Sequence, residues 1–169
     1  LFRSDREKLL GLNGRGRNAQ LNLAKEFGFD EFESPGGGCP YTMEGFSNRI
    51  RDFIKFDNNM SEDDLQSLRY GRHLRLPDGA KMIIGRDQND NEKLEALKLE
   101  KMDSINYDGI IGAHSFIDKN ASDLDRALAA KLAISYCKSE PNVVYKAKIG
   151  DKIIEATKCD KSEAAKYFI

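Results

Sequence analysis

Two turn signals after residue 70 limit what the chain can fold into. The first is PDG at residues 77–79, inside RHLRLPDGAKMIIG, and the second is GD at 150–151, inside NVVYKAKIGDKIIEATK. Apolar and polar residues alternate on both sides of each signal, as in strands that bury one face. Turn residues between two such runs are typical of a β-hairpin. Two hairpins predict a largely antiparallel sheet, and the first should turn these residues toward the core: Leu74, Leu76, Met82 and Ile84.

Helical patterns surround the hairpins. Apolar residues recur at helical spacing in residues 16–28, 42–56, 61–71, 87–103, 122–139 and 161–169, and 105–118 reads as strands broken at glycines. Ser61, Ser122 and Thr42 are suited to N-caps, and Gly28 to a C-cap. The helix at 122–139 should bury the apolar face Leu124, Leu128, Leu132 and Ala133.

These patterns predict an α+β fold with two parts. A helical arm over residues 1–67 carries a glycine-rich loop with a cysteine, and residues 68–169 form a mostly antiparallel sheet packed with helices. The chain begins at LFRSDREKLL without a methionine, so we expect it to be a piece of a longer protein.

Charge and cysteine usage exclude several classes of function. The net charge of the 169 residues is only -1, so overall charge gives no argument for nucleic acid. Cys39, Cys137 and Cys159 are an odd count without a CxxC pair, which argues against a disulfide scaffold or a zinc ribbon and favours the cytoplasm. No metal site is expected, and no apolar run approaches the ~18 residues of a membrane span.

Arginine is distributed unevenly, and this favours a local binding face. Arginine binds phosphate through two donors and stacks on bases, so a local cluster could bind RNA in a chain that is neutral overall. The alternative is a solvated surface with ion pairs. Every arginine except Arg126 lies at or before residue 86: Arg3, Arg6, Arg15, Arg17, Arg49, Arg51, Arg69, Arg72, Arg75 and Arg86.

The glycine-rich loop ESPGGGCPYT, residues 33–42, leaves two interpretations open. A phosphate-binding loop is disfavoured because GK[ST] is absent and the preceding FDEFE is acidic. A tight turn explains the glycines and prolines. A reactive cysteine explains Cys39 as well, because backbone amides and a following helix N-terminus lower a thiol pKa.

Residues 6–54 resemble the region that follows the ATP-pyrophosphatase domain of tRNA 2-thiouridylases. Ser34, Gly38, Cys39 and Phe46 stand where that family has its Ser-x-Gly-x-Cys segment and a helical Phe. GRHLRLPDGAKMIIGRDQNDNEKL, residues 71–94, resembles a second motif of a thiouridylase-like bacterial subgroup. The resemblance implies that Cys39 carries a persulfide for tRNA thiolation. Pro40 departs from the family's Phe, and the chain has no adenylating loop.

The second half resembles the RNA-binding domain of NFACT proteins, in the variant fused to thiouridylase-like enzymes. Cys137 and Asp87 replace the family's usual Ser and Asn. The residues that match in order are Gly85, Asn89, Asn91, Gly112, His114, Tyr136 and Lys138.

Together, the two resemblances imply the C-terminal part of a thiouridylase-like protein that is not active alone. Its expected partners are tRNA or another structured RNA, an upstream ATP-pyrophosphatase domain and a sulfur-donor protein. No cofactor is expected in this chain, because ATP would bind only upstream. The alternative is a non-catalytic RNA- or protein-interaction module in which Cys39 is a turn residue. The predicted RNA-binding residues are Arg15, Arg17, Arg49, Arg51, Arg72, His73, Arg75, Lys81, Arg86 and His114.

Overall fold

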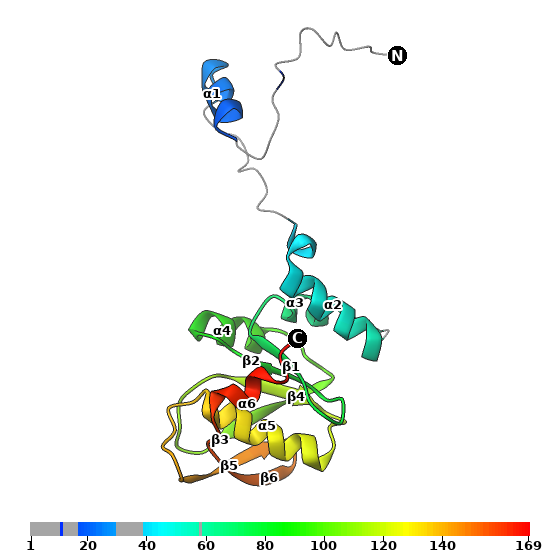
Figure 1. Ribbon diagram of the computed structural model, residues 1–169, viewed down its shortest axis with the longest axis vertical. Coiled ribbons are helices and arrows are strands. Elements are labelled where there is room, and N and C mark those ends of the chain that lie inside the picture. Colours follow the sequence, from blue (N-terminus) through cyan, green and yellow to red (C-terminus); the bar gives the residue numbers. More distant parts are fainter. Residues whose placement is uncertain (1–10, 12–16, 30–38, 58) are drawn as a thin grey trace. The chain divides into compact units, whose positions relative to one another are not determined.

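The computed structural model describes residues 11, 17–29, 39–57 and 59–169. The chain divides into two compact units, Leu1–Cys39 and Pro40–Ile169. In the first unit, α1 (Asn18–Glu26) confirms the predicted helix in shorter form (Figure 1). Phe27 is its C-cap, and the Gly28 N–H donates to Lys25 O at 3.0 Å.

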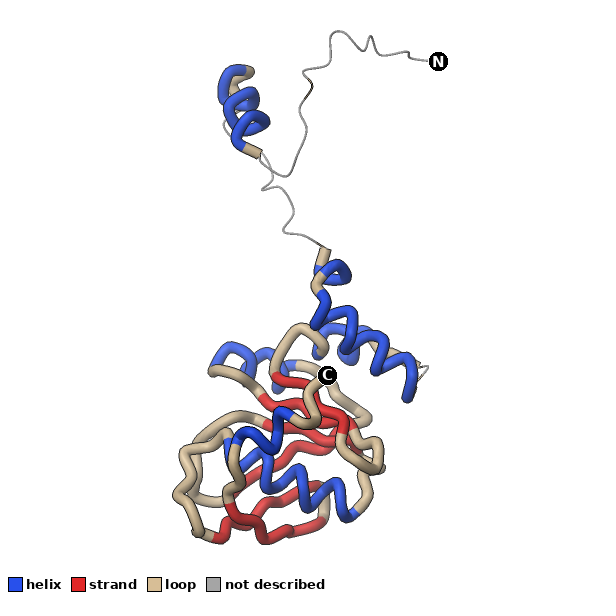
Figure 2. The backbone as a smooth tube through the Cα atoms, in the orientation of Figure 1, coloured by secondary structure: helices blue, strands red, loops and turns tan. Residues whose placement is uncertain are grey.

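The second unit is built on one six-stranded sheet with the order β1-β2-β4-β3-β5-β6 (Figure 2). Every neighbouring pair is antiparallel, which confirms the predicted α+β class. The strands are β1 (Arg72–Arg75), β2 (Lys81–Ile84), β3 (Met102–Tyr107), β4 (Ser115–Asp118), β5 (Val144–Ile149) and β6 (Lys152–Thr157).

The PDG turn between β1 and β2 forms as predicted. Leu76 N donates to Ala80 O and Gly79 N to Leu76 O, both at 2.9 Å. Gly79 has a φ of 96°, which L side chains rarely adopt. Asp125 stabilises the turn from outside, because its carboxylate accepts from Asp78 N at 3.2 Å and Ala80 N at 3.0 Å. The second hairpin, β5–β6, is also confirmed.

One face of the sheet packs against α5 (Asp123–Ser135) and α6 (Lys161–Ala165), where Leu74, Met82 and Ile84 are fully buried. Ser122 caps α5 as predicted. The expected burial of Leu124 is wrong, because its side chain is 76% exposed. Asp125 turns toward the hairpin, and the buried face is therefore shifted to these residues: Ala129, Ala130, Leu132, Ala133 and Ile134.

The opposite face of β1 and β2 is covered by the segments before the sheet. These are η2 (Pro40–Thr42), α2 (Glu44–Phe56) and α3 (Glu62–Ser67), whose apolar cluster contains Phe46, Phe53 and Leu68. Ser61 caps α3 in a complete capping box, as predicted. The predicted cap of α2 is wrong, because the N-cap is Met43, which makes no side-chain cap bond. Thr42 instead belongs to the 3₁₀ turn.

Several predicted helices are shorter than expected, and in two of them the reason is visible. The helix predicted over 87–103 is α4 (Gln88–Ala96), because Leu97 is extended and Met102 already pairs with Asp118 in the sheet. The helix predicted over 122–139 ends at Ser135, so Cys137 lies just beyond it, and not in mid-helix. Cys137 is half-buried and forms an isolated bridge with Gly112.

Candidate nucleic-acid interface

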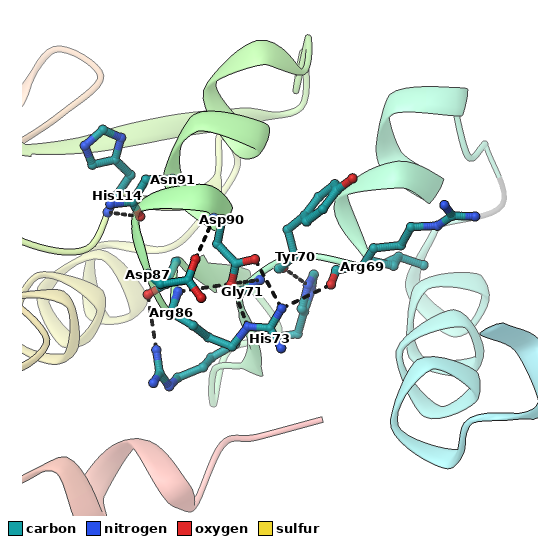
Figure 3. Close-up of polar contacts among 12 residues, drawn as sticks. Arg69, Tyr70, Gly71, His73, Arg86, Asp87, Asp90, Asn91 and His114 are labelled. Atoms are coloured by element: carbon teal, nitrogen blue, oxygen red, sulfur yellow. Dashed lines mark hydrogen bonds and ion pairs between the residues drawn. The ribbon is translucent and has the colours of Figure 1, made fainter. Parts of the chain in front are cut away.

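Asp90 organises the open end of the β1–β2 hairpin (Figure 3). Its side chain lies in the first turn of α4 and is buried, and Asp87 caps that helix by accepting from Asp90 N at 2.9 Å. One carboxylate oxygen of Asp90 accepts from Gly71 N at 3.0 Å, Arg86 N at 3.2 Å and Arg86 Nε at 2.6 Å. The other accepts from Arg86 Nη2 at 3.1 Å. Asp90 therefore joins the start of β1 to the end of β2.

The guanidinium groups of Arg49, Arg72 and Arg86 lie near this carboxylate, and Arg69 contributes its main-chain carbonyl, while its own side chain is exposed. We name Arg49, Arg69, Arg72 and Arg86 the arginine cluster. Arg86 Nη2 lies 3.4 Å from Arg69 O. Arg72 Nη1 donates to Gly85 O at 3.1 Å, and Arg49 Nη1 to Leu68 O at 2.8 Å. The four come from α2, the α3–β1 link, β1 and the β2–α4 link, so only the folded chain brings them together.

The electrostatics of the arginine cluster favour an anion. Burial, and then the neighbouring Arg86 guanidinium, lower the pKa of Arg49. Arg49 Nε is buried and has no hydrogen-bond partner among the described residues. The hydrogen bond to Asp90 raises the pKa of Arg86, and the same bond lowers the pKa of Asp90. Arg86 is therefore held fully charged beside a second guanidinium that it repels.

An aromatic ring extends the cluster toward α5 and α6. The Arg72 guanidinium carbon lies 4.8 Å from the centroid of the Tyr136 ring, and Lys161 Nζ lies 5.3 Å from the same centroid. Both contacts are within the range of cation–π attraction. We name the arginine cluster together with Tyr136 and Lys161 the basic surface. Guanidinium groups beside an aromatic ring suit phosphates and unstacked bases.

Two of the predicted RNA-binding residues lie at the other end of the hairpin. Arg75 forms a two-pronged ion pair with Asp52 of α2, donates to Gly79 O at 2.7 Å and lies 4.0 Å above the Phe56 ring centroid. Lys81 is only 5% exposed, and burial lowers its pKa to about 8. Arg75 thus joins α2 to the sheet, and neither residue belongs to the basic surface.

The two predicted histidines occupy different surroundings. His73 is buried, its Nε2 lies 2.9 Å from Tyr70 O, and burial lowers its pKa well below the ordinary value. His114 Nδ1 lies 2.8 Å from a Glu95 oxygen, so a carboxylate already occupies the position that a phosphate would take. His73 is buried and His114 contacts Glu95, so neither histidine belongs to the basic surface.

The remaining predicted residues are dispersed. Arg51 is exposed on α2 and donates to Asn48 Oδ1 at 3.0 Å, while Arg17 is exposed at the N-terminus of α1 in the first unit. Cys39 is exposed. Arg15 and Gly36 to Gly38 lie outside the described residues.

The motif residues of the second half hold the fold together. Asn91 Oδ1 accepts from His114 N at 3.1 Å, and its Nδ2 lies 3.4 Å from Gly112 O (Figure 3). A Cβ at Gly85 would lie 2.0 Å from Asn91 Oδ1, so only glycine leaves room for this amide. The pattern Gly-Asn-Gly-His therefore joins α4 to the segment before β4.

Sequence reasoning missed Arg69, Tyr136 and Lys161 as members of one surface, and Asp90 as its organiser. Tyr136 belongs to the family pattern found in the sequence, but no binding role was predicted for it. The spacing of Arg86 and Asp90, four residues apart at a helix start, was a usable signal for an ion pair.

The described part of the chain gives two further findings. None of its helices has the length and apolar character that crossing a membrane requires. Its His, Cys, Asp and Glu side chains form no group of three or more placed to hold a metal ion.

Comparisons with known proteins identify the second half. A family model described as the NFACT protein RNA binding domain matches residues 71–168, more than half of the chain. No curated protein matches the chain. One similar solved structure is the C-terminal part of the fibronectin/fibrinogen-binding protein from Streptococcus suis, at 16% identity and a TM-score of 0.49. That match covers 74% of this chain and 61% of the other, so the chain spans less than two thirds of that structure.

Proposed function

We propose, from the premise that this chain belongs to the family of NFACT protein RNA-binding domains, that its basic surface binds the phosphate backbone of structured RNA. The observation that carries the proposal is that the guanidinium groups of Arg49, Arg72 and Arg86 lie at one end of the hairpin, with Tyr136 and Lys161 beside Arg72. Arginine forks bind phosphate oxygens in pairs, and aromatic rings stack on bases that leave the helix.

Local charge supports this proposal better than total charge does. The chain has a net charge of -1, so nonspecific attraction to RNA is weak. Burial, and then repulsion by Arg86, lower the pKa of Arg49. A phosphate bound beside Arg86 would relieve that repulsion. Phosphate binding would thus be concentrated at the basic surface.

The test is a charge-matched pair of double variants. Arg69→Gln/Arg72→Gln removes two positive charges from the basic surface. Arg51→Gln/Lys55→Gln removes two from exposed positions that helical spacing puts on the other side of α2 from Arg49. We expect the first variant to bind an unmodified tRNA transcript at least about tenfold more weakly at low salt, because charge-assisted hydrogen bonds contribute about 1.5–3 kcal/mol.

The salt dependence provides a second readout of the same experiment. The slope of log affinity against log salt should flatten by about two for Arg69→Gln/Arg72→Gln, if each arginine neutralises one phosphate. For the control variant Arg51→Gln/Lys55→Gln, the affinity for tRNA should stay within about twofold of the wild-type value, and so should the salt slope. Equal losses in the two variants, with circular dichroism unchanged, would mean that the basic surface is no special site.

The finer hypothesis concerns tRNA thiolation. Here the chain would present tRNA to an upstream ATP-pyrophosphatase domain, and Cys39 would relay sulfur from a donor protein. The exposure of Cys39 supports this role, because a relay cysteine must reach both the donor and the RNA. The alternative, an interaction module in which Cys39 only forms part of a turn, predicts an ordinary thiol.

Brief treatment with iodoacetamide at neutral pH distinguishes these two roles of Cys39. We expect labelling of Cys39 before Cys137, because Cys39 is exposed while burial raises the pKa of Cys137. Mass-spectrometric peptide mapping measures both sites in one sample. Faster labelling of Cys137 would contradict the relay hypothesis, and a Cys39 rate equal to that of a small-molecule thiol would favour the turn.

A further inference from the structure

A cavity of about 520 Å³ lies within the second unit, at the end of β1 away from Arg72. It is bounded by the end of α2, by α3, by the β1–β2 turn and by the β4–α5 loop. Residues on its wall include Phe53, Phe56, Arg75, Lys81 and Asp118. RNA binding by the basic surface does not use this cavity.

Lys81 presents a buried ammonium to the cavity. The residue is 5% exposed, and Nζ lies 4.6 Å from the Phe53 ring centroid. Among the described residues, Nζ is not one of the buried atoms that lack a hydrogen-bond partner, and Lys81 lies on the wall of the cavity. The acids of α2 and α3 are engaged elsewhere, since Asp52 pairs with Arg75 and Asp64 lies 3.5 Å from Lys101 Nζ. An ammonium group on a cavity wall beside an aromatic ring can donate hydrogen bonds to a ligand oxygen.

Asp118 provides the complementary group. It follows Ile117, which pairs with Met82, so strand alternation puts the side chains of Asp118 and Lys81 on the same face of the sheet. One of its oxygens accepts from Lys81 N at 2.6 Å, and Arg75 Nη1 lies 3.8 Å away. Burial raises the pKa of Asp118, and the charges of Arg75 and Lys81 oppose that rise. Lys81 and Asp118 influence each other without forming an ion pair, which leaves room for a ligand between them.

The mouth of the cavity has a flat platform. The Phe56 ring is 51% exposed, and the Arg75 guanidinium lies 4.0 Å from its centroid. Aromatic rings and guanidinium planes are the surfaces on which unstacked bases pack. Asp57, Asp78 and Glu100 also line the cavity, together with Lys101 and Lys119, so its wall carries charges of both signs. A neutral, flat ligand with both acceptor and donor atoms fits this wall.

We propose that this cavity binds one unstacked guanine base of the RNA, with Lys81 donating to the base carbonyl and Asp118 accepting from its N–H groups. The inference rests on the proposed RNA-binding function. In it, the basic surface binds phosphates of the RNA and the cavity binds one base. Guanine carries a carbonyl oxygen next to two N–H donors, which together match an ammonium and a carboxylate. Adenine has no carbonyl, and uracil has a single N–H.

Two single-stranded probes test the base preference: ten-nucleotide oligouridylate, and the same oligomer with one central guanine. We expect the wild type to bind the guanine probe about tenfold more tightly by fluorescence anisotropy, the usual scale of discrimination by one base contact. Lys81→Met and Asp118→Asn should bind both probes equally. Lys98→Met removes the same charge from an exposed position and should keep the preference.

A measurement on the unmodified protein guards against variants that fold poorly. Reductive methylation of Lys81 by formaldehyde and a borane should be slowed severalfold by the guanine probe and not by oligouridylate. Equal binding of both probes, or methylation unaffected by either, would overturn the guanine site even if Arg69→Gln/Arg72→Gln loses tRNA binding as expected. If the wild type binds neither tRNA nor either probe, the proposed function is overturned together with this inference.

Discussion

Replacing Asp90 by alanine is expected to lower the free energy of unfolding by about 3 kcal/mol, the upper end of the cost of leaving a buried donor without its acceptor. The carboxylate is buried and accepts four hydrogen bonds, from Gly71 N and from three nitrogens of Arg86. Alanine leaves the buried Gly71 N–H without an acceptor and the Arg86 guanidinium without its counter-ion. The start of β1 would then separate from α4, and the arginine cluster would lose its geometry.

Asp87→Ala is the matched control for this loss. It removes an exposed carboxylate from the same helix start and costs only a cap, about 1 kcal/mol. Urea unfolding followed by circular dichroism measures both variants. A loss for Asp90→Ala no larger than that for Asp87→Ala would refute the organising role of Asp90.

The pH dependence of the Asp90 contribution has a definite sign. Arg86 lowers the folded-state pKa of Asp90 below that of the unfolded chain. The stabilisation is therefore complete above the unfolded value of about 4 and is lost as the pH falls through the folded value. The stability gap between wild type and Asp90→Ala should narrow on acidification below about pH 4.

Replacing Lys81 by methionine is expected to raise the free energy of unfolding by about 3 kcal/mol at pH 7. Burial lowers the pKa of this lysine from 10.5 to about 8, so keeping the ammonium charged in the folded state costs stability. Methionine keeps the length of the side chain and its packing on Phe53 without the charge. A residue that costs stability in a cavity fits a binding role there better than a structural one.

Both the sign and the pH window of the Lys81 effect can be checked. The folded state binds the Lys81 proton less tightly than the unfolded state, so the penalty is fully present below about pH 8. It disappears as the pH rises toward the unfolded value of about 10.4. Charged groups on the elements packed around Lys81 also change its pKa. Arg75 lowers this pKa further, whereas Asp52, Asp118 and Asp64 raise it.

Thermal unfolding of wild type and Lys81→Met at pH 7 and pH 9.5 tests this account. The advantage of the methionine variant should shrink by more than half between the two conditions. The exposed Lys98→Met should show no advantage at either pH. A methionine variant less stable than wild type at pH 7 would show that the ammonium has a partner.

Local sequence predicted most of the secondary structure. The PDG turn, the Gly150-Asp151 turn and the caps at Ser61 and Ser122 depend on neighbours within a few residues, and all of them form. The length of α4 could not be predicted in this way, because the chain leaves the helix in order to pair Met102 with Asp118. Leu124 was misjudged because Asp125 is turned toward a loop far away in the sequence.

The candidate site was also predicted only in part, because contacts between distant segments decide which of its residues meet. An excess of arginine in the first half suggested a cationic face, and Arg49, Arg72 and Arg86 belong to it. Arg75 and Lys81 face each other across β1 and β2, and nothing local indicates that α2 covers both. Tyr136 and Lys161 meet Arg72 only after α5 and α6 pack on the sheet. Long-range packing therefore decides which cations can reach RNA.

The most direct test of RNA binding at the basic surface is an NMR titration of the isotope-labelled chain with an unmodified tRNA transcript. The guanidinium Nε–Hε signals of Arg69, Arg72 and Arg86 and the amide of Tyr136 should shift or broaden at the lowest RNA concentrations. The amides of β6, at the far edge of the sheet, should stay unchanged. Shifts confined to α1 or to β5 and β6, with the arginine signals unmoved, would contradict the account.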